Sequence, residues 1–306
     1  MPEWQIGGAS TVTPGIFRRV SIGMPVYNGE GYIREALDSL LSQTYQDFEL
    51  IISDNASTDG TEVICLEYAQ KDSRIRYVRQ LENQGPAANF QFVLDEAKGE
   101  YFMWAAHDDF WGGDFLSAGI EALAVDQDAV AAFGRVEYVN DENKVFLIDL
   151  PPYGLRNNQY CSTATYLSTN IPDHLIYGLY RRDFLLRHGW RAGICSPDKI
   201  IIFNAVVSGG YIDAPRMELR IRYRAKTRSE LENIGMSFSK WQIFYASYLM
   251  ARIIWHHFSI GASIKLLIML LKYRTPITHR ILGGILREHP GRAWLEQGTH
   301  RVTDGS

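Results

Sequence analysis

The stretch Tyr101-Phe102-Met103-Trp104-Ala105-Ala106-His107-Asp108-Asp109 joins an apolar run to two adjacent carboxylates. A short apolar run of this kind is typical of a strand in a sheet that helices cover on both faces. Ligands of such sheets bind at the carboxyl ends of the strands. Neighbouring like charges repel unless a cation or a donor group lies between them, so Asp108 and Asp109 predict a metal and phosphate site. Capping of the next helix is the alternative explanation.

Strands and helices alternate along the chain on both sides of this stretch. Apolar runs that end at turn residues predict strands over residues 20–26, 48–53 and 75–78, and a segment with helical spacing follows each of them. Another strand is expected over residues 129–139, with a hairpin turn at residues 140–143. The alternation predicts an α/β fold, in which a doubly wound, mostly parallel sheet has helices on both faces.

The second half of the chain is less regular. Ser196-Pro197-Asp198 has the cap, proline and acid of a helix start, and Gly209-Gly210 marks the end of that helix. From Glu218 onward, strict alternation predicts a strand whose basic side chains share one face: Arg220, Arg222, Arg224, Lys226 and Arg228. An edge strand whose charges prevent aggregation is the alternative. Residues 140–175 have no readable period, and irregular loops that contact substrate are expected there.

Composition narrows the class of protein. With 306 residues, 46% of them hydrophobic, the chain can bury one large core or a core and a small appendage. Its formal charge of -4 and pI near 6.1 argue against nucleic-acid binding. Cys65, Cys161 and Cys195 lie far apart, which suggests neither a zinc site nor a disulfide framework, so a cytoplasmic location is expected. Residues 1–19 are expected to be an irregular lead-in, and they lack the pattern of a secretory signal.

The end of the chain is strongly apolar. Residues 230–306 are expected to form a C-terminal helical region, most apolar over residues 237–288. Arg252 and Lys265 interrupt it, so no stretch reaches the roughly 18 uncharged residues of a spanning helix. Helices that lie peripherally on the inner face of the cell membrane, or that pack on a partner or a second copy, are expected. Ordinary packing against the rest of the chain is the alternative.

Five motifs follow one another between residues 20 and 120: Pro25-Val26-Tyr27-Asn28, Leu41-Ser42-Gln43-Thr44-Tyr45, Asp54-Asn55-Ala56-Ser57-Thr58-Asp59-Gly60-Thr61, Asn83-Gln84-Gly85 with Asn89, and His107-Asp108-Asp109. Their order and approximate spacing resemble the family 2 glycosyltransferases, which are inverting enzymes of the GT-A fold. The resemblance implies a GT-A domain over residues 20–229. It also implies a nucleoside diphosphate sugar donor, UDP- or dTDP-linked, and a Mg²⁺ or Mn²⁺ ion. The implied acceptor is a hydroxyl of a saccharide or a lipid-linked saccharide.

The resemblance also assigns residues to the donor site. It implies that nucleotide is bound by Pro25, Val26, Tyr27, Asn28, Asp54, Asn55, Asn89 and Asp108, the last near the ribose. Asp109 is implied as the metal ligand. Independently of the family, Asp54 and Asp109 each follow a predicted strand, which places both acids at one sheet edge. Many members carry a basic residue just before the position of Asn89, where this chain has Ala88, and this departure affects recognition of the base.

An inverting transfer also needs a base that takes the proton of the attacking hydroxyl. In the family this is an acid at the start of a helix under the acceptor, which Asp198 matches, while Asp173 and Asp183 are lower-ranked candidates. Stabilisation of the helix dipole is the alternative role for Asp198. Arg224, Lys226 and Arg228 resemble the basic segment that folds over the diphosphate, a task for which bidentate arginine is suited.

Two other classes of function compete with this one. A non-catalytic nucleotide-sugar-binding or scaffolding protein of a polysaccharide assembly complex would use the helical tail as its main contact. A dinucleotide-dependent oxidoreductase has a similar pattern of strands and helices. It is poorly supported because residues 24–29 lack the three glycines that let a backbone approach a pyrophosphate.

Overall fold

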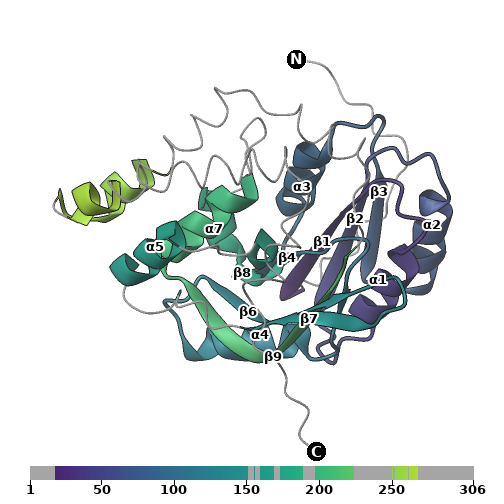
Figure 1. The fold of residues 1–306 in the computed structure, drawn as a ribbon. Helices are drawn as coiled ribbons and strands as arrows, with labels where there is room; N and C mark the ends of the chain where they lie inside the picture. Colours follow the sequence, from purple (N-terminus) through teal and green to yellow (C-terminus); the bar gives the residue numbers. More distant parts are fainter. Residues whose placement is uncertain are drawn as a thin grey trace, which may run out of the picture.

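The structure, a computed structural model, describes residues 18–150, 155, 159–168, 173–188, 197–223, 250, 252–260 and 262–267. Its strands form one sheet in the order β3-β2-β1-β4-β8-β6-β9-β5, and β7 pairs with β6 (Figure 1). The strands are β1 (Val20–Val26), β2 (Phe48–Asp54), β3 (Ile75–Arg79), β4 (Tyr101–Trp104), β5 (Phe110–Trp111), β6 (Ala131–Val139), β7 (Val145–Asp149), β8 (Leu179–Arg181) and β9 (Tyr211–Arg222). The helices are α1 (Ile33–Leu41), α2 (Thr61–Lys71), α3 (Pro86–Asp95), α4 (Phe115–Val125), α5 (Gln159–Ser168), the 3-10 helix η1 (Asp173–Tyr177), α6 (Arg182–His188) and α7 (Pro197–Ser208).

Parallel strands form the first half of the sheet. β1 pairs in parallel with β2 and with β4, and β2 pairs in parallel with β3. Figure 1 shows α1 and α2 on one side of these strands and α3 on the other. Helix α1 buries Ile33, Ala36, Leu37 and Leu40, which is the helical spacing read from the sequence. The prediction of an α/β fold with helices on both faces is therefore confirmed.

The second half of the sheet departs from parallel pairing. β8 inserts between β4 and β6 and runs antiparallel to both. Its 3 residues are too few to show a period, so the sequence does not predict it. β7 and α5 also lie within residues 140–175, where the sequence predicts only loops, and that prediction is wrong for them. The hairpin turn at residues 140–143 is confirmed, because Asn143 N–H donates to Asn140 O at 2.9 Å between β6 and β7.

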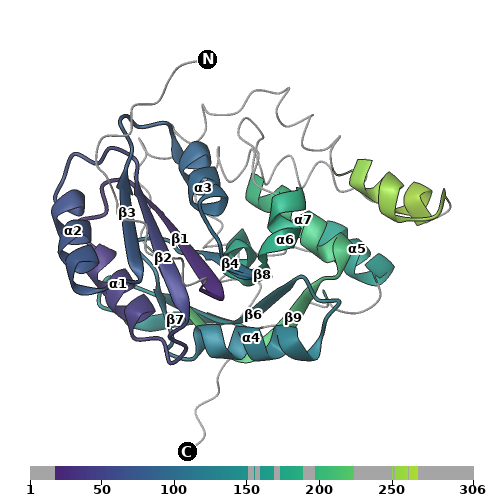
Figure 2. The same cartoon turned by 180° about the vertical axis from the view of Figure 1, so that it is seen from behind.

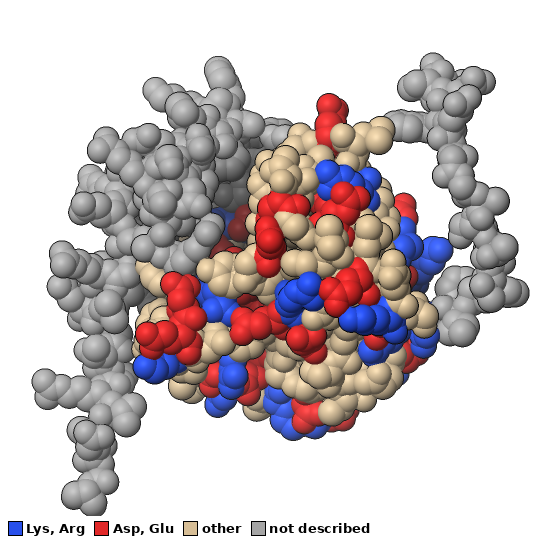
Figure 3. Space-filling view, turned by 90° about the vertical axis from the view of Figure 1, so that its right-hand side faces the viewer, with Lys and Arg blue, Asp and Glu red and all other residues tan. Residues whose placement is uncertain are grey.

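β9 extends the predicted strand with one basic face. It begins at Tyr211 rather than Glu218, and it pairs with β6 on one side and with β5, at Leu219 and Arg220, on the other. The edge-strand alternative for Arg224, Lys226 and Arg228 lies outside the described residues and stays untested. Arg220 Nε donates to Glu137 Oε2 on β6 at 2.9 Å, and the Arg222 side chain is buried. On the face in Figure 3, basic and acidic side chains are interspersed in the same way. The described part of the strand therefore carries compensated charge.

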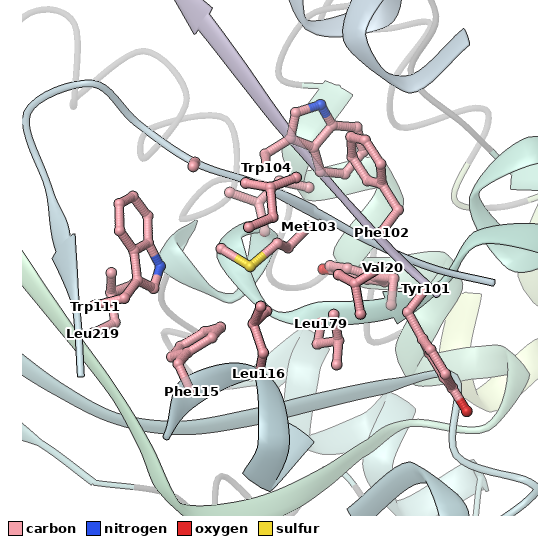
Figure 4. Close-up of a cluster of buried hydrophobic side chains, with 14 of the residues drawn as sticks. Val20, Tyr101, Phe102, Met103, Trp104, Trp111, Phe115, Leu116, Leu179 and Leu219 are labelled. Atoms are coloured by element: carbon pink, nitrogen blue, oxygen red, sulfur yellow. The ribbon is translucent and has the colours of Figure 1, made fainter. Parts of the chain in front are cut away.

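β4, the apolar run that ends near the acid pair, lies in the core. Tyr101, Phe102, Met103 and Trp104 are each no more than 2% exposed. Trp104 Nε1–H donates to Phe90 O at 3.1 Å, which satisfies the one polar group of the indole. Phe102 meets the Trp104 ring edge-on, with centroids 4.9 Å apart. Figure 4 shows these side chains packed together with residues of other strands and of α4, so the chain that leads into the acid pair is firmly held.

Part of the C-terminal region packs against the rest of the chain. Met250, Ile254 and Leu266 share a hydrophobic cluster with Leu167 of α5 and Phe203 of α7. Figure 2 shows this helical segment, in yellow-green, beside α5. Among the described helices, none combines the length and the apolar character needed to cross a bilayer. The domain limits at residues 19 and 229 fall at or beyond the edge of what is described, and they stay predictions.

Gly134, at the register shift between β6 and β9, gives a test of how closely these two strands pack. A Cβ on Gly134 would meet the carbonyl oxygens of Met217 and Ala214, the latter at 2.5 Å. We expect Gly134→Ala to lower the free energy of unfolding by about 3 kcal/mol, because backbone on both sides cannot give way. Gly31→Ala is the matched control, since nothing lies within 4 Å of a Cβ there. Urea unfolding of both variants measures the difference, and equal midpoints would contradict the register described.

Candidate active site

The carboxyl ends of the parallel strands bring the sequence motifs to one sheet edge. Val26 at the end of β1 pairs with Asp54 at the end of β2, and Asp54 pairs with Arg79 at the end of β3. The loops after β1 and β4 also meet, because a Cβ on Gly29 would lie 2.8 Å from His107 Cδ2. The segments around residues 25–28, 54–55 and 107–109 are therefore neighbours, as the sequence predicts.

Hydrogen bonds join the loop after β1 to the loop after β2. Asn28 N–H donates to Ser57 Oγ at 2.9 Å, and Asn28 Oδ1 accepts from Thr58 N–H at 2.8 Å. Gly29 N–H donates to Thr61 Oγ1 at 2.8 Å. Asn28 has a φ of 52°, a left-handed conformation that asparagine tolerates better than most residues. Pro25 and Val26 are buried, whereas Tyr27 is 45% exposed and Asn28 is also exposed, so Tyr27 and Asn28 are the members of this motif that a ligand can reach.

Asp54 is fully buried and fully paired. Its Oδ1 accepts from Ser57 N–H at 2.8 Å, and its Oδ2 accepts from Tyr77 Oη–H at 2.7 Å and from Arg79 Nη1 at 2.9 Å. Burial and the neighbouring Asp54 carboxylate raise the pKa of Tyr77, so the phenol remains a donor. Tyr77 and Arg79 are site residues that the sequence reading missed. Their position at the end of the third predicted strand, in register with Asp54, is the signal that identifies them.

Asn55 and Asn89 both organise backbone. Asn55 Nδ2 donates to Asn83 Oδ1 at 2.9 Å, while its Oδ1 accepts from Gln84 N–H at 2.9 Å. Asn89, which is 4% exposed, donates from Nδ2 to Ser53 O at 2.8 Å and accepts from Ser53 Oγ–H at 2.5 Å. These bonds hold the 83–85 loop and α3 against the end of β2. Direct contact of either asparagine with a nucleotide stays a prediction.

The acid pair is divided between a buried and a more accessible carboxylate. Asp109 is 5% exposed, and its Oδ1 accepts from Arg222 N–H of β9 at 3.1 Å. Burial, followed by the charge of Asp108, raises the pKa of Asp109 to about 8, although Arg222 opposes the shift. Asp108 is partly exposed. A buried carboxylate whose ionised form is destabilised by a neighbouring acid favours a cation beside it.

The residues present fit a divalent cation that donor phosphates help to hold. Within the described residues, no three His, Cys, Asp or Glu side chains gather as a metal cluster. Magnesium is commonly bound by only one or two carboxylates together with substrate phosphates, so a third protein ligand is not required. Asp108 and Asp109 supply those carboxylates, with oxygen ligands of the type that Mg²⁺ and Mn²⁺ prefer.

Asp198 lies in the first turn of α7, as the sequence predicts. Burial, and then the charge of Asp173, raise the pKa of Asp198 to about 6. Lys199, next to it, pairs instead with Asp173 at 2.7 Å, so this lysine does not form an ion pair with the Asp198 carboxylate. Asp183 is exposed on α6. Of the three candidate bases, Asp198 therefore has the environment that best suits proton transfer near neutral pH.

Helix η1 connects the two groups of acids, and the sequence does not predict it. It packs against β4, which leads into the acid pair, and against α7, which carries Asp198 in its first turn. Burial raises the pKa of Tyr177 of η1, and the charges of Asp109, Asp108 and Asp198 raise it further. The acids after β4 and at the start of α7 thus belong to elements that pack on the same short helix.

Comparison with known proteins places this site in a family. The sequence model described as Glycosyl transferase family 2 matches residues 21–185 of the chain. The chain belongs to this family. It is 46% identical over 125 residues to an uncharacterized glycosyltransferase of Rickettsia typhi, a match that covers 40% of this chain and 38% of that protein. It is 38% identical over 104 residues to the putative teichuronic acid biosynthesis glycosyltransferase TuaG of Bacillus subtilis, covering 34% of this chain and 41% of that protein.

These matches span less than half the length of the curated relatives. Solved structures extend the likeness to the fold of nearly the whole chain. TarS of S. aureus, residues 1–349, superimposes with a TM-score of 0.61 at 16% identity, covering 91% of this chain and 78% of that one. The mannosyltransferase PcManGT of Pyrobaculum calidifontis, in complex with GDP-Man and Mn²⁺, has a TM-score of 0.56 at 21% identity, covering 95% and 83%. The fold is that of the GT-A glycosyltransferases.

Arg222 is the basic residue that the structure brings to this family's acid pair. Its side chain pairs with Glu35 of α1 and lies over the Tyr32 ring, 4.7 Å from the centroid. Its backbone N–H donates to Asp109, so the end of β9 lies beside the acid pair. The predicted diphosphate ligands Arg224, Lys226 and Arg228 lie outside the described residues, and their role stays a prediction.

A pair of asparagine variants tests the structural role of the α3 asparagine. Asn89→Asp replaces the Nδ2 donor by an oxygen that faces the carbonyls of Ser53 and Val26. We expect it to lower the free energy of unfolding by about 2 to 4 kcal/mol. Asn83→Asp is the control, because Asn83 Oδ1 accepts from Asn55 Nδ2 and from Gly85 N–H, and an aspartate oxygen can accept both bonds. Urea unfolding measures both, and equal stability of the two variants would contradict this account of Asn89.

Proposed function

We propose that the chain is an inverting glycosyltransferase that moves a sugar from a nucleoside diphosphate sugar to a hydroxyl of a saccharide or lipid-linked saccharide. One observation carries the proposal: helix η1 packs both against β4, which leads into Asp108 and Asp109, and against α7, which carries Asp198. In our proposal the donor diphosphate binds at the acid pair and the acceptor hydroxyl at Asp198, so that η1 joins the two ends of a direct displacement.

The donor end is the edge formed by β1, β2 and β4. Solved structures with this fold support a nucleotide-sugar donor, since TarS was crystallised with UDP-GlcNAc and PcManGT with GDP-Man. In our proposal the nucleobase lies against Tyr27 and the loop that Asp54 anchors, the ribose lies near Asp108 and the diphosphate near Asp109. A bound Mg²⁺ or Mn²⁺ would supply Lewis-acid stabilisation of the charge on the departing diphosphate. UDP and dTDP are the nucleotides that we favour.

The acceptor end is the start of α7. Asp198 accepts the proton of the acceptor hydroxyl while that oxygen bonds to the anomeric carbon and the nucleoside diphosphate leaves from the opposite face. A pKa of about 6 leaves Asp198 mostly ionised at neutral pH, yet more basic than an exposed aspartate. The relative TuaG is named for teichuronic acid biosynthesis, which supports an acceptor that is part of an envelope polysaccharide.

The C-terminal helices suit an enzyme that works beside a membrane or in an assembly. Trp255, Ile260 and Ile264 are 58%, 68% and 49% exposed. Exposed apolar side chains on one segment are typical of contact with a lipid surface or with a partner. We propose that this region holds the enzyme peripherally at the inner face of the membrane, near a lipid-linked acceptor.

Metal-dependent donor binding tests the role of the acid pair. Asp109→Asn keeps an acceptor for Arg222 N–H but removes the negative charge, so we expect the affinity for UDP with MnCl₂ to fall at least tenfold, about 1.4 kcal/mol. Calorimetry with UDP, dTDP and GDP, with and without MnCl₂, measures this. Asp95→Asn is the control, since Asp95 is an exposed acid at the far end of α3. Unchanged affinity in Asp109→Asn would rule out its role as metal ligand.

Substitution of the proposed base gives a separate test. We expect Asp198→Asn to bind the donor normally but to transfer sugar at least about 100-fold more slowly, because the proton has no acceptor. Wild-type activity should fall tenfold for each pH unit below about 6, where Asp198 becomes protonated. Asp173→Asn should shift this fall in activity to lower pH, because the charge of Asp173 raises the pKa of Asp198. The exposed Asp183→Asn serves as control, and normal transfer by Asp198→Asn would show that the assignment is wrong.

The same assays separate an enzyme from a binding or scaffolding protein. A scaffold binds nucleotide but neither hydrolyses the donor nor transfers its sugar under excess MnCl₂. An enzyme releases UDP slowly even without acceptor, and Asp109→Asn abolishes that release. Anomeric configuration of the product, read by NMR, distinguishes inversion from retention.

A further inference from the structure

An aromatic surface lies on one face of the β6, β7 and β9 strands. Tyr138 of β6 is in register with Ile221 of β9, so Tyr223, two residues further on, is directed to the same face as Tyr138. Phe146 lies at the irregularity between β6 and β7, beside both of them. The ring centroids of Tyr138 and Phe146 are 6.5 Å apart, and those of Phe146 and Tyr223 are 5.7 Å apart. Phe146 is 50% exposed and Tyr223 is 37% exposed.

Tyr138, the least exposed ring of the aromatic surface, is held by buried polar groups. Tyr138 Oη lies 2.9 Å from His174 Nδ1, and His174 Nε2 lies 3.5 Å from Asp149 Oδ2 on β7. His174 also stacks on Phe133, with centroids 5.4 Å apart. Burial lowers the pKa of His174 to about 3, so the imidazole is neutral. Its hydrogen bond to Tyr138 Oη holds the Tyr138 ring, against which Phe146 rests.

The aromatic surface adjoins the elements that carry the candidate acids. Arg222, next to Tyr223, reaches Asp109 through its backbone N–H. Tyr138 contacts His174 of η1, and Asp173 of the same helix pairs with Lys199, next to Asp198, at 2.7 Å. The aromatic surface is therefore joined to the acid pair through β9 and to the start of α7 through η1.

We propose that Phe146 and Tyr223 form a stacking platform for a pyranose ring of the acceptor, held in place by Asp149, His174 and Tyr138. This inference rests on the proposed function. A pyranose has an apolar C–H face that suits a rigid aromatic ring, and hydroxyls at its edge that suit nearby carboxylates and phenols. Stacking next to Tyr177 would direct an acceptor hydroxyl towards Asp198.

The surroundings of the platform favour a neutral saccharide over other occupants. The hairpin tip carries Asp141 and Glu142, and Lys144 is paired with Glu142 at 2.7 Å, so an anionic lipid surface or a nucleic acid would be repelled. Asn143 at the tip donates to Glu35 Oε1 of α1 at 3.0 Å, which ties the hairpin to the domain. A platform anchored at both ends is preorganised for a small ligand.

Saturation-transfer NMR on the full chain tests the proposal. The probes are methyl β-glycosides of glucose, galactose, N-acetylglucosamine and mannose. Phe146→Ala should weaken the best of these at least tenfold and raise the KM of transfer to it, with UDP affinity unchanged. Phe146→Tyr should restore both values. Ile148→Ala is the matched control: Ile148 is 49% exposed on the same strand but is in register with Glu137, so it lies on the opposite face.

Other results would contradict either the platform or the proposed function. If Phe146→Ala and Ile148→Ala bind the glycosides equally well, or if no glycoside binds a wild-type chain that does bind UDP with MnCl₂, the platform is overturned while the proposed function stands. If Phe146→Ala changes sedimentation but not glycoside binding, the surface is an interface between proteins and the platform is again overturned. Failure of the wild type to bind any nucleotide counts against the proposed function itself. Phe146→Tyr, which keeps the ring, guards against misfolding of the alanine variant.

Discussion

The hydrogen bond from Arg222 N–H to Asp109 Oδ1 joins the two halves of this molecule. Asp109 follows β4 in the parallel half of the sheet, and Arg222 ends β9 in the mixed half, where β9 runs parallel to β6 and antiparallel to β5. A buried carboxylate needs such a donor, since without one its desolvation would be uncompensated. The bond to Asp109 therefore requires the end of β9 to lie beside the loop after β4, with β5 paired to β9. This contact brings the edge formed by β1, β2 and β4 together with the half of the sheet that contains β9.

Charge compensation follows the same principle around the rest of the site. Asp54 is neutralised by Arg79, and Arg222 by Glu35, although one member of each pair is almost completely buried. A buried charge without its partner would be costly, so these pairs hold the strand ends and α1 in one arrangement. Asp109 and Asp198 differ from these paired residues, because burial and a neighbouring acid raise the pKa of each. Acids with raised pKa values are typical of functional sites.

Membership of glycosyl transferase family 2 and a GT-A fold agree with this arrangement. The parallel half presents loops that are cross-linked by backbone and side-chain bonds, which preorganises them for a ligand. The mixed half contributes Tyr177, His174 and the aromatic face of β7 and β9, which differ in chemistry from the edge formed by β1, β2 and β4. Our proposals assign a charged donor to the first half and a neutral acceptor to the second.

The sequence by itself determined the strands and helices of residues 20–139 other than β5, the position of Asp109 beyond a buried strand, and the placement of Asp198 in a first helical turn. These features follow from local periodicity and from turn and cap residues, which act over a few positions of the chain. Only the tertiary structure decided that β8 enters the sheet antiparallel, that the basic residues of β9 face glutamates, and that η1 packs against both β4 and α7. The contact between Arg222 and Glu35 spans 187 positions. No local pattern encodes a pairing of that length, because register and packing of the whole sheet set which distant side chains meet.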